Sequence, residues 1–293
     1  MAVNAERKRQ FVAAYDAMLA RWTMAPAARD VATAGATTHV QIWGKPDAPP
    51  LMMLHGFKVS STMWAPNAAA FGAVRRVYAP DMLGDYGLST TEKPPRSLDE
   101  LLVWMERLLD ALELPAVDLG GMSYGGWLSA HFAARRPERV RKLVLLAPGA
   151  TFGSFSAAWY LRGMPMIFWH RRAFVESYLR WAGVAPSDAA ARADYDGFLG
   201  ALVDVMHHGH RTFPVFGLPV PQPLPDDVAR KIVAPTLLLY GEAEKMYPAK
   251  AALEVAQQRI ASLQAELIPQ ASHDLTFAQP ARVNQRVTQF LTS

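Results

Sequence analysis

Short runs of mainly apolar residues recur along the chain, and each run ends in small or polar residues. They lie at 51–54, 77–79, 117–119, 143–147, 236–240 and 265–268. Runs with so little polar alternation are typical of strands that are covered on both faces. Residues 38–43 alternate loosely and predict one more strand before them. The pattern therefore favours a mostly parallel sheet.

Helical periodicity separates these runs. Residues 4–22 place large apolar side chains three or four positions apart, which predicts an amphipathic helix. Another helix is marked at its start, where Glu100 follows Ser97 in a capping-box pattern, and its apolar stripe continues to Leu112. Three more helices are expected after Ser123, over 249–262 and from Pro280 onward. Strands that alternate with helices predict a doubly wound α/β core.

The alternation breaks between residues 151 and 230. This stretch is rich in aromatic residues, Met and Pro, and it shows no clear strand. We predict a helical lid inserted into the core, bounded by the proline-rich segment 214–225. The expected organisation is the first part of the core with an N-terminal helix in 1–150, the lid or cap in 151–230, and the second part of the core in 231–293.

Composition narrows the function classes. The chain has 293 residues, of which 51% are hydrophobic and 19% charged, so it can bury a large core without extensive disorder. It has no cysteine, which excludes disulfides, thiolate metal sites and a cysteine nucleophile. The net charge is +4, but the basic residues are dispersed, and we expect no nucleic-acid partner. No apolar stretch is long enough to span a membrane, and charged residues precede the first apolar run, so a cytoplasmic location is expected.

The strongest chemical signal is Gly121-Met122-Ser123-Tyr124-Gly125. This G-x-S-x-G pattern comes directly after the apolar run 117–119 and just before a helical segment. A tight strand-to-helix turn of this kind exposes a strained serine, and small neighbours are needed to avoid clashes. The segment lacks the Gly-Lys-Ser/Thr ending of a phosphate-binding loop. Ser123 is therefore the candidate nucleophile.

With this motif the sequence resembles the α/β-hydrolase superfamily, and more narrowly its lidded, esterase-like members. The resemblance extends from about Leu51 to Phe290 and is weakest in the lid. Besides the serine motif, its marks are Leu54-His55-Gly56-Phe57, the segment from Pro80 to Ser89, Gly241-Glu242-Ala243-Glu244 and Ala271-Ser272-His273. The resemblance implies an α/β-hydrolase fold, a mostly parallel doubly wound sheet with an inserted helical lid.

A serine is a poor nucleophile near neutral pH, so it needs a base and an acid that orients the base. The resemblance implies these partners in the order serine, acid, histidine, and it assigns the base to His273, after the last apolar run. The acid position, three residues beyond the glycine that ends the seventh strand, falls on Glu244. Many relatives carry Asp there, so this side chain is longer by one methylene. Glu242 is the competing carboxylate.

Attack by serine places negative charge on an oxygen, which preorganised backbone N–H groups stabilise. The motif geometry assigns these donors to Tyr124, after the nucleophile, and to Phe57, after the His-Gly pair. Three polar residues in the loop after the fourth strand are expected to bind neighbouring backbone groups: Asp81, Asp85 and Ser89.

The lid supplies a hint about the substrate. Its residues Trp159, Met164 and Phe168 are expected to line an apolar pocket if they face inward, although side chains of this kind also pack lids onto cores. The lid histidines His207, His208 and His210 have no carboxylate or cysteine framework around them, so we expect no metal, and no cofactor is implied.

Together these features predict a serine hydrolase that cleaves a carboxylic ester or related acyl substrate through an acyl-enzyme on Ser123. The same residues would serve a thioesterase or a carbon–carbon bond hydrolase. A non-hydrolytic lyase, cyclase or biosynthetic enzyme on the same fold is the alternative from another class. The expected partner is a small apolar acyl molecule, and the sequence leaves a homodimer open.

Overall fold

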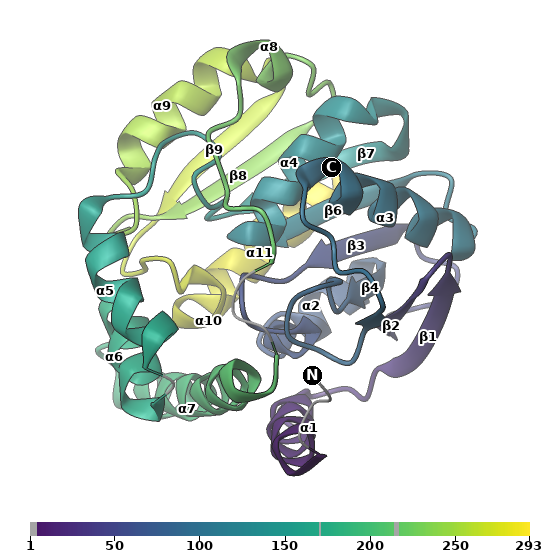
Figure 1. Ribbon diagram of the computed structural model, residues 1–293. Coiled ribbons are helices and arrows are strands. Elements are labelled where there is room, and N and C mark those ends of the chain that lie inside the picture. The colour runs from purple at the N-terminus through teal and green to yellow at the C-terminus, as the bar shows by residue number, and fades with distance from the viewer. Residues whose placement is uncertain (1–4, 170, 214–216) are drawn as a thin grey trace.

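The computed structural model describes residues 5–169, 171–213 and 217–293, and within them the strands form one nine-stranded sheet. Its order is β1-β2-β4-β3-β6-β7-β8-β9, and the short β5 pairs with β2 (Figure 1). The strands are β1 Ala27–Thr33, β2 Ala36–Trp43, β3 Pro50–Leu54, β4 Arg76–Pro80, β5 Thr90–Thr91, β6 Val117–Met122, β7 Val140–Leu146, β8 Thr236–Gly241 and β9 Leu263–Ile268. Along the stretch β4-β3-β6-β7-β8-β9 of that order, every neighbouring pair is parallel. The strand β2 instead pairs antiparallel with β1, β4 and β5.

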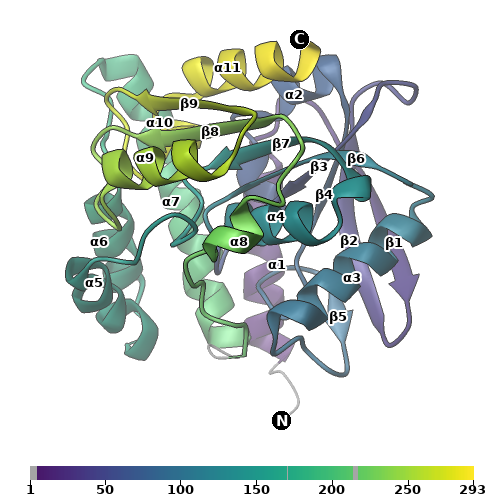
Figure 2. The same cartoon turned by 90° about the horizontal axis from the view of Figure 1, so that it is seen from above.

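Helices cover both faces of the sheet. The α-helices are α1 Ala5–Leu19, α2 Ala68–Val74, α3 Leu98–Ala111, α4 Tyr124–Arg135, α5 Ala157–Phe168, α6 Arg172–Ala182, α7 Ala189–Thr212, α8 Asp226–Ala229, α9 Ala249–Arg259, α10 Leu275–Ala278 and α11 Pro280–Thr292. Two 3-10 helices are η1 Ser61–Trp64 and η2 Pro137–Arg139. α2 and α11 pack on one face, and α3, α4, α8 and α9 lie on the other (Figure 2). The predicted α/β-hydrolase architecture is confirmed.

Each predicted apolar run falls on a strand, and two of these strands are buried on both faces. All six residues of β6 and of β8 are buried, as the lack of polar alternation indicated. The predicted capping box also forms, because Ser97 Oγ accepts from the Glu100 N–H and the Glu100 carboxylate accepts from the Ser97 N–H. The strand β1 was not predicted, because most of its residues are exposed. An edge strand of this kind carries a weak apolar signal.

The segment between β7 and β8 contains α5, α6 and α7, which lie together beyond one end of the sheet (Figure 1). It holds no strand among its described residues. α1 packs against α7, and the ring of Phe11 meets the ring of Phe213 edge-on at 4.8 Å. The division into core and lid at 151 and 230 stays a prediction, and the first residues of its proline-rich boundary, 214–216, lie outside the described residues.

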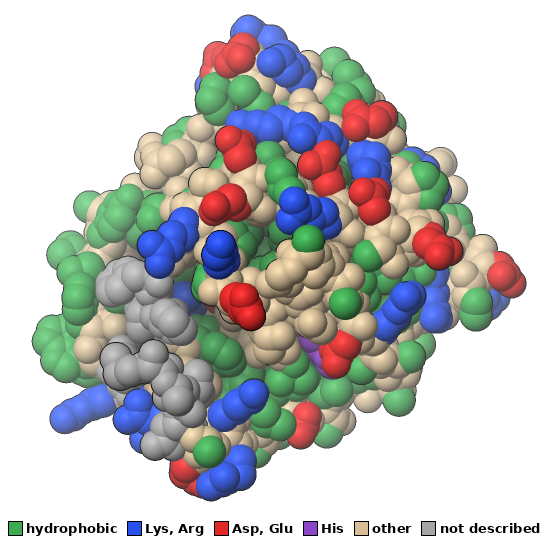
Figure 3. Space-filling model, turned by 45° about the vertical axis from the view of Figure 1, so that its right-hand side comes forward, with side chains coloured by type: hydrophobic (Ala, Val, Ile, Leu, Met, Phe, Trp, Pro, Cys, Tyr) green, Lys and Arg blue, Asp and Glu red, His purple; other side chains and the backbone are tan. Residues whose placement is uncertain are grey.

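Charged side chains of both signs are interspersed on the face shown in Figure 3. None of the described helices is long and apolar enough to cross a membrane. The homodimer remains a prediction.

Candidate active site

Ser123 stands on the sharp turn between β6 and α4. Its backbone has φ 52° and ψ −111°, and a sparsely populated conformation of this kind costs on the order of 1–3 kcal/mol. A Cβ atom on Gly121 would lie 2.4 Å from the carbonyl carbon of Gly125, and one on Gly125 would lie 2.3 Å from the carbonyl oxygen of Leu54. The two glycines therefore allow the strand, the turn and β3 to approach closely enough to present Ser123.

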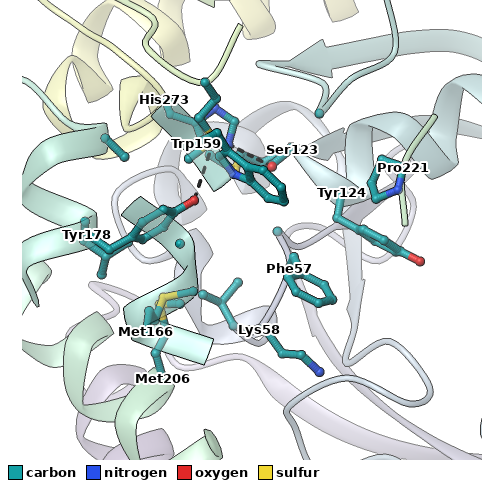
Figure 4. Close-up of a pocket in the computed structure, with 18 of the residues that line it drawn as sticks. Phe57, Lys58, Ser123, Tyr124, Trp159, Met166, Tyr178, Met206, Pro221 and His273 are labelled. Atoms are coloured by element: carbon teal, nitrogen blue, oxygen red, sulfur yellow. Dashed lines mark hydrogen bonds between the residues drawn. The ribbon is translucent and has the colours of Figure 1, made fainter. Parts of the chain in front are cut away.

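His273 reaches Ser123 from the loop after β9. Its Nε2 lies 2.8 Å from Ser123 Oγ, and its Nδ1 lies 2.8 Å from Glu244 Oε2. An ionised carboxylate only accepts hydrogen bonds, so Nδ1 donates to Glu244 and Nε2 is left to accept from the serine hydroxyl. Figure 4 shows His273 above Ser123 with the hydrogen bond between them. The structure thus brings the three sequence-selected side chains into one chain of hydrogen bonds.

Glu244 is held on both of its oxygens. Oε2 faces His273, and Oε1 accepts from the backbone N–H groups of Lys245 and Met246, each at 2.9 Å. The Glu244 side chain is fully buried, whereas Glu242, the competing carboxylate, is exposed. The loop after β8 is fitted tightly against the histidine loop, because a Cβ on Gly241 would lie 2.2 Å from the carbonyl oxygen of Ser272. The extra methylene of Glu is accommodated within this loop.

The two N–H groups expected to bind an oxyanion belong to Tyr124, which follows Ser123 in the chain, and to Phe57. Tyr124 is the first residue of α4, where backbone N–H groups have no partner within the helix. Gly56, which precedes Phe57, approaches the nucleophile so closely that an added Cβ would lie 3.7 Å from Ser123 Cβ. Phe57 and Tyr124 both line the cavity in front of Ser123, and their rings lie 5.6 Å apart. Their roles as donors remain predictions.

Asp85 fixes the loop that carries Phe57. Its carboxylate accepts from the backbone N–H of Lys58 at 3.1 and 3.0 Å and from that of Tyr86 at 2.9 Å. Lys58 has a left-handed backbone with φ 60°, and its buried ammonium lies 3.8 Å from Asp85 and over the rings of Phe57 and Tyr86. Burial raises the pKa of Asp85 and lowers that of Lys58, and the charge of each opposes the shift of the other.

Asp81 fixes the next turn of the same region. It accepts from the backbone N–H of Ser61 and of Leu88, both at 2.8 Å, and Ser89 Oγ donates to its backbone carbonyl. These contacts match the expectation that the polar residues after β4 bind backbone groups near the site.

A cavity of about 370 Å³ lies in front of Ser123 and His273. Its walls are mainly apolar and come from residues 56–59, from α5, α6 and α7, and from residues 217–221. Trp159 and Met164 line it, as the sequence analysis expected. Phe168 is not among the lining residues, and it is 56% exposed. It follows Ile167, which does line the cavity, and successive helical positions differ by about 100°, which turns Phe168 away from the cavity.

Several cavity residues were not identified from the sequence. Tyr178 on α6 points toward His273 and Trp159 in Figure 4, and its hydroxyl lies 3.9 Å from Met246 Sδ. Burial raises the pKa of Tyr178, so its phenol stays protonated. The prediction of a helical lid over 151–230 did not indicate which of its side chains face the cavity. Lys58 was missed because a lysine side chain is rarely buried unless it is paired with an opposite charge.

The lid histidines lie near the end of α7. The rings of His207 and His208 are 5.1 Å apart, and burial lowers the pKa of both. His210 is buried, and its ring nitrogen Nδ1 pairs with the carbonyl oxygen of Met206 at 2.7 Å. Within the described residues, no three His, Asp or Glu side chains form a group suited to a metal ion.

Comparison with known proteins identifies the family. Residues 49–187 match the model described as the alpha/beta hydrolase fold. Carboxylesterase YbfK of Bacillus subtilis is 33% identical over 96% of this chain and 93% of its own length. Its crystal structure, described as carboxylesterase CesB, superposes with a TM-score of 0.87 at 32% identity over 98% of this chain and 99% of that one. The crystal structure of naproxen esterase from the same organism superposes with a TM-score of 0.89 at 29% identity over 99% of both chains.

A relative of this similarity over nearly the whole length shows that the chain belongs to the α/β-hydrolase family. Within that family it is one of the esterase-like members, as the sequence motifs predicted.

Proposed function

We propose that this protein is a carboxylic ester hydrolase that works through an acyl-enzyme on Ser123. The observation that carries the proposal is the continuous line of hydrogen bonds from Ser123 through His273 to Glu244, at the wall of a mainly apolar cavity. The carboxylesterase names of the relatives that match over nearly the full length support the same reaction.

In the first half of the reaction, an ester carbonyl lies against Ser123. The serine oxygen attacks the carbonyl carbon as its proton moves to Nε2 of His273, and the imidazolium formed is stabilised by Glu244. The carbonyl oxygen becomes an oxyanion and accepts hydrogen bonds from the N–H groups of Phe57 and Tyr124. Preorganised donors of this kind contribute roughly 3–4 kcal/mol each in related sites. The intermediate collapses, and the alcohol leaves with the proton from His273.

In the second half, a water molecule replaces the alcohol. His273 takes one proton from the water, the hydroxide oxygen attacks the acyl carbon, and the carboxylic acid leaves while the proton returns to Ser123 Oγ. Each half therefore uses the same base and the same oxyanion donors. The buried position of Glu244 keeps its carboxylate available for His273 in both halves.

The lining of the cavity favours ester substrates with an apolar acyl or alcohol group. Its lining by Trp159, Met164, Met166 and Met206 provides apolar surface that can be buried against such a group. Lys58 also lines the cavity, and its ammonium lies 3.8 Å from the carboxylate of the buried Asp85, which balances its charge. The cavity walls therefore favour esters without free charges near the carbonyl.

The test is covalent labelling with a fluorophosphonate, which reacts only with an activated serine. We expect one adduct on Ser123 in the native protein and none on Ser123→Ala. A series of p-nitrophenyl esters from acetyl to decanoyl then measures the acyl preference through kcat/KM. Absence of an adduct on folded protein would remove the proposal, and an adduct combined with indifference to every ester would favour the lyase or cyclase alternative.

A further inference from the structure

The end of α6 is bound by both loops that carry the proposed acid and base. We define the α6 exit segment as Trp181, Ala182, Gly183 and Val184, which contains the last two residues of α6 and the two that follow. The final carbonyl groups of a helix have no partner within it, so they need donors from elsewhere. In this protein those donors come from the residues next to Glu244 and from His273 itself.

The acid loop supplies the first contact. Lys245 directly follows Glu244, and its Nζ donates to the carbonyl oxygen of Trp181 at 2.9 Å and to that of Gly183 at 3.3 Å. A cation is favourable at the carboxyl end of a helix because the helix dipole is negative there. The backbone N–H of Lys245 meanwhile donates to Glu244 Oε1, so this one residue contacts both the acid and the lid.

The base loop supplies the second contact. The backbone N–H of His273 donates to the carbonyl oxygen of Ala182 at 3.2 Å. The next residue, Asp274, is buried, and its Oδ2 accepts from the N–H of Val184 at 2.8 Å and from the hydroxyl of Tyr195 on α7 at 2.8 Å. Its Oδ1 accepts from the N–H of Ser272 at 3.0 Å, one residue before the base.

The fit around Asp274 is tight. A Cβ atom on Gly183 would lie 2.4 Å from Asp274 Oδ2 and 2.5 Å from the hydroxyl oxygen of Tyr195. Burial raises the pKa of Asp274, and the donors at Ser272, Tyr195 and Val184 oppose that shift. The mechanism does not otherwise use this carboxyl group, yet it lies next to the base.

We propose that Asp274 is a positioning residue, which together with Lys245 uses the α6 exit segment as a brace to hold His273 against Glu244. The inference rests on the proposed function. Glu244 and His273 belong to two loops, and a shift of about 1 Å between reacting groups can lower a rate by as much as 10²-fold. Two loops attached to one helix end move together with it, so the imidazole keeps both of its hydrogen bonds through the catalytic cycle. The lid is then part of the catalytic machinery at this end.

The test is Asp274→Asn, which has the same shape but replaces one acceptor oxygen by an amino group. The new amino group must then face either the N–H of Ser272 or the two donors at Val184 and Tyr195, and a donor that faces a donor loses its hydrogen bond. We expect kcat for p-nitrophenyl butyrate to fall roughly tenfold to 10²-fold, with KM changed less than about threefold, because positioning acts on the chemical step and not on substrate binding. Tyr195→Phe removes one of the donors and is expected to lower kcat by less.

Lys245 provides the second pair of variants. Lys245→Met removes the side-chain donor to the α6 exit segment, and we expect it to lower kcat. Lys245→Arg keeps a side-chain donor, and we expect it to have nearly wild-type kcat. The control is Arg172→Met at the other end of α6, which removes ion pairs with Glu176 and Asp204 and is expected to leave kcat unchanged.

The inference would be overturned if folded Asp274→Asn had wild-type kcat, or if only its KM were raised. It would also be overturned if Arg172→Met lost as much kcat as Asp274→Asn. If Asp274→Asn does not fold, equal activities of Lys245→Met and Lys245→Arg overturn it. Fluorophosphonate labelling of wild-type Ser123 separates this failure from failure of the proposed function, which would abolish labelling itself.

Discussion

The two oxygens of Glu244 have different partners, and this makes Glu244→Gln a sharp test of the proposed acid. In the wild type, one oxygen accepts from two backbone N–H groups, and the other accepts from Nδ1 of His273. A glutamine side chain has the same shape as glutamate, but an amino group that only donates replaces one of the two acceptor oxygens. If the oxygen stays with the backbone donors, the amino group faces His273 and forces the proton onto Nε2. His273 is then unable to accept the proton of Ser123.

The size of the effect follows from the cost of the other orientation. Turning the amide restores the correct tautomer, but the N–H groups of Lys245 and Met246 then face an amino group. Each donor left without a partner costs about 1–3 kcal/mol, so the active orientation lies roughly 2–6 kcal/mol higher. At 1.36 kcal/mol per factor of ten, that lowers its population by about 30-fold to 3 × 10⁴-fold. Lys245 is exposed, and water there offsets part of the cost, so we expect the lower half of this range, about 30-fold to 10³-fold in kcat.

The assay is steady-state hydrolysis of p-nitrophenyl butyrate, with the rate of fluorophosphonate labelling as a direct measure of serine reactivity. KM should change little, because Glu244 does not line the cavity. Glu242→Gln is the matched control, since it makes the same chemical change two residues away on an exposed side chain. A folded Glu244→Gln enzyme that keeps more than about one tenth of wild-type kcat would refute the reasoning, and an equal loss in Glu242→Gln would refute the assignment.

Three further expectations follow from the geometry. Gly125→Ala places a Cβ 2.3 Å from the carbonyl oxygen of Leu54, so we expect a melting temperature lowered by several degrees and loss of labelling; a stable, labelled variant would contradict the strained turn. Burial, with a smaller contribution from Arg135, lowers the pKa of His131 to about 3. Between about pH 6.5 and 3, the unfolded chain therefore binds more protons at this residue than the folded protein does. The free energy of unfolding then falls as the pH drops through that range, by up to about 1.4 kcal/mol per pH unit. His131→Phe should flatten that slope in chemical denaturation, and an unchanged slope would show that other groups cause it. Met206→Trp fills part of the cavity, so the preference in kcat/KM should move toward shorter acyl chains, and an unchanged profile would place the acyl group elsewhere.

Local signals predicted the strands and the candidate nucleophile Ser123, because each of these features is a short-range requirement. The turn at Ser123 needs glycines at fixed neighbouring positions, and a buried parallel strand needs an uninterrupted apolar run, so both features can be recognised without knowing the rest of the structure. The resemblance to the α/β-hydrolase superfamily assigned His273 and Glu244 from their positions after particular strands, and the strands lie where the apolar runs predicted them.

The cavity was predicted less well, because its shape depends on how helices are rotated against the core. The composition of 151–230 predicted a helical lid, but α5 is largely apolar, so the sequence did not distinguish Met164, which lines the cavity, from Phe168, which does not. The contacts of Lys245 and Asp274 with the end of α6 join segments about sixty to ninety residues apart, and no local pattern encodes them.

The packing of α1 against α7 gives the amino-terminal helix influence over the substrate cavity. Tyr15 on α1 contacts Ser61 and Gln41 in the core, while Phe11 contacts Phe213 at the end of α7. α7 contributes Phe198, Leu202 and Met206 to the cavity wall. A substitution at Phe11 is therefore expected to act on the cavity through α7, although Phe11 itself does not line it.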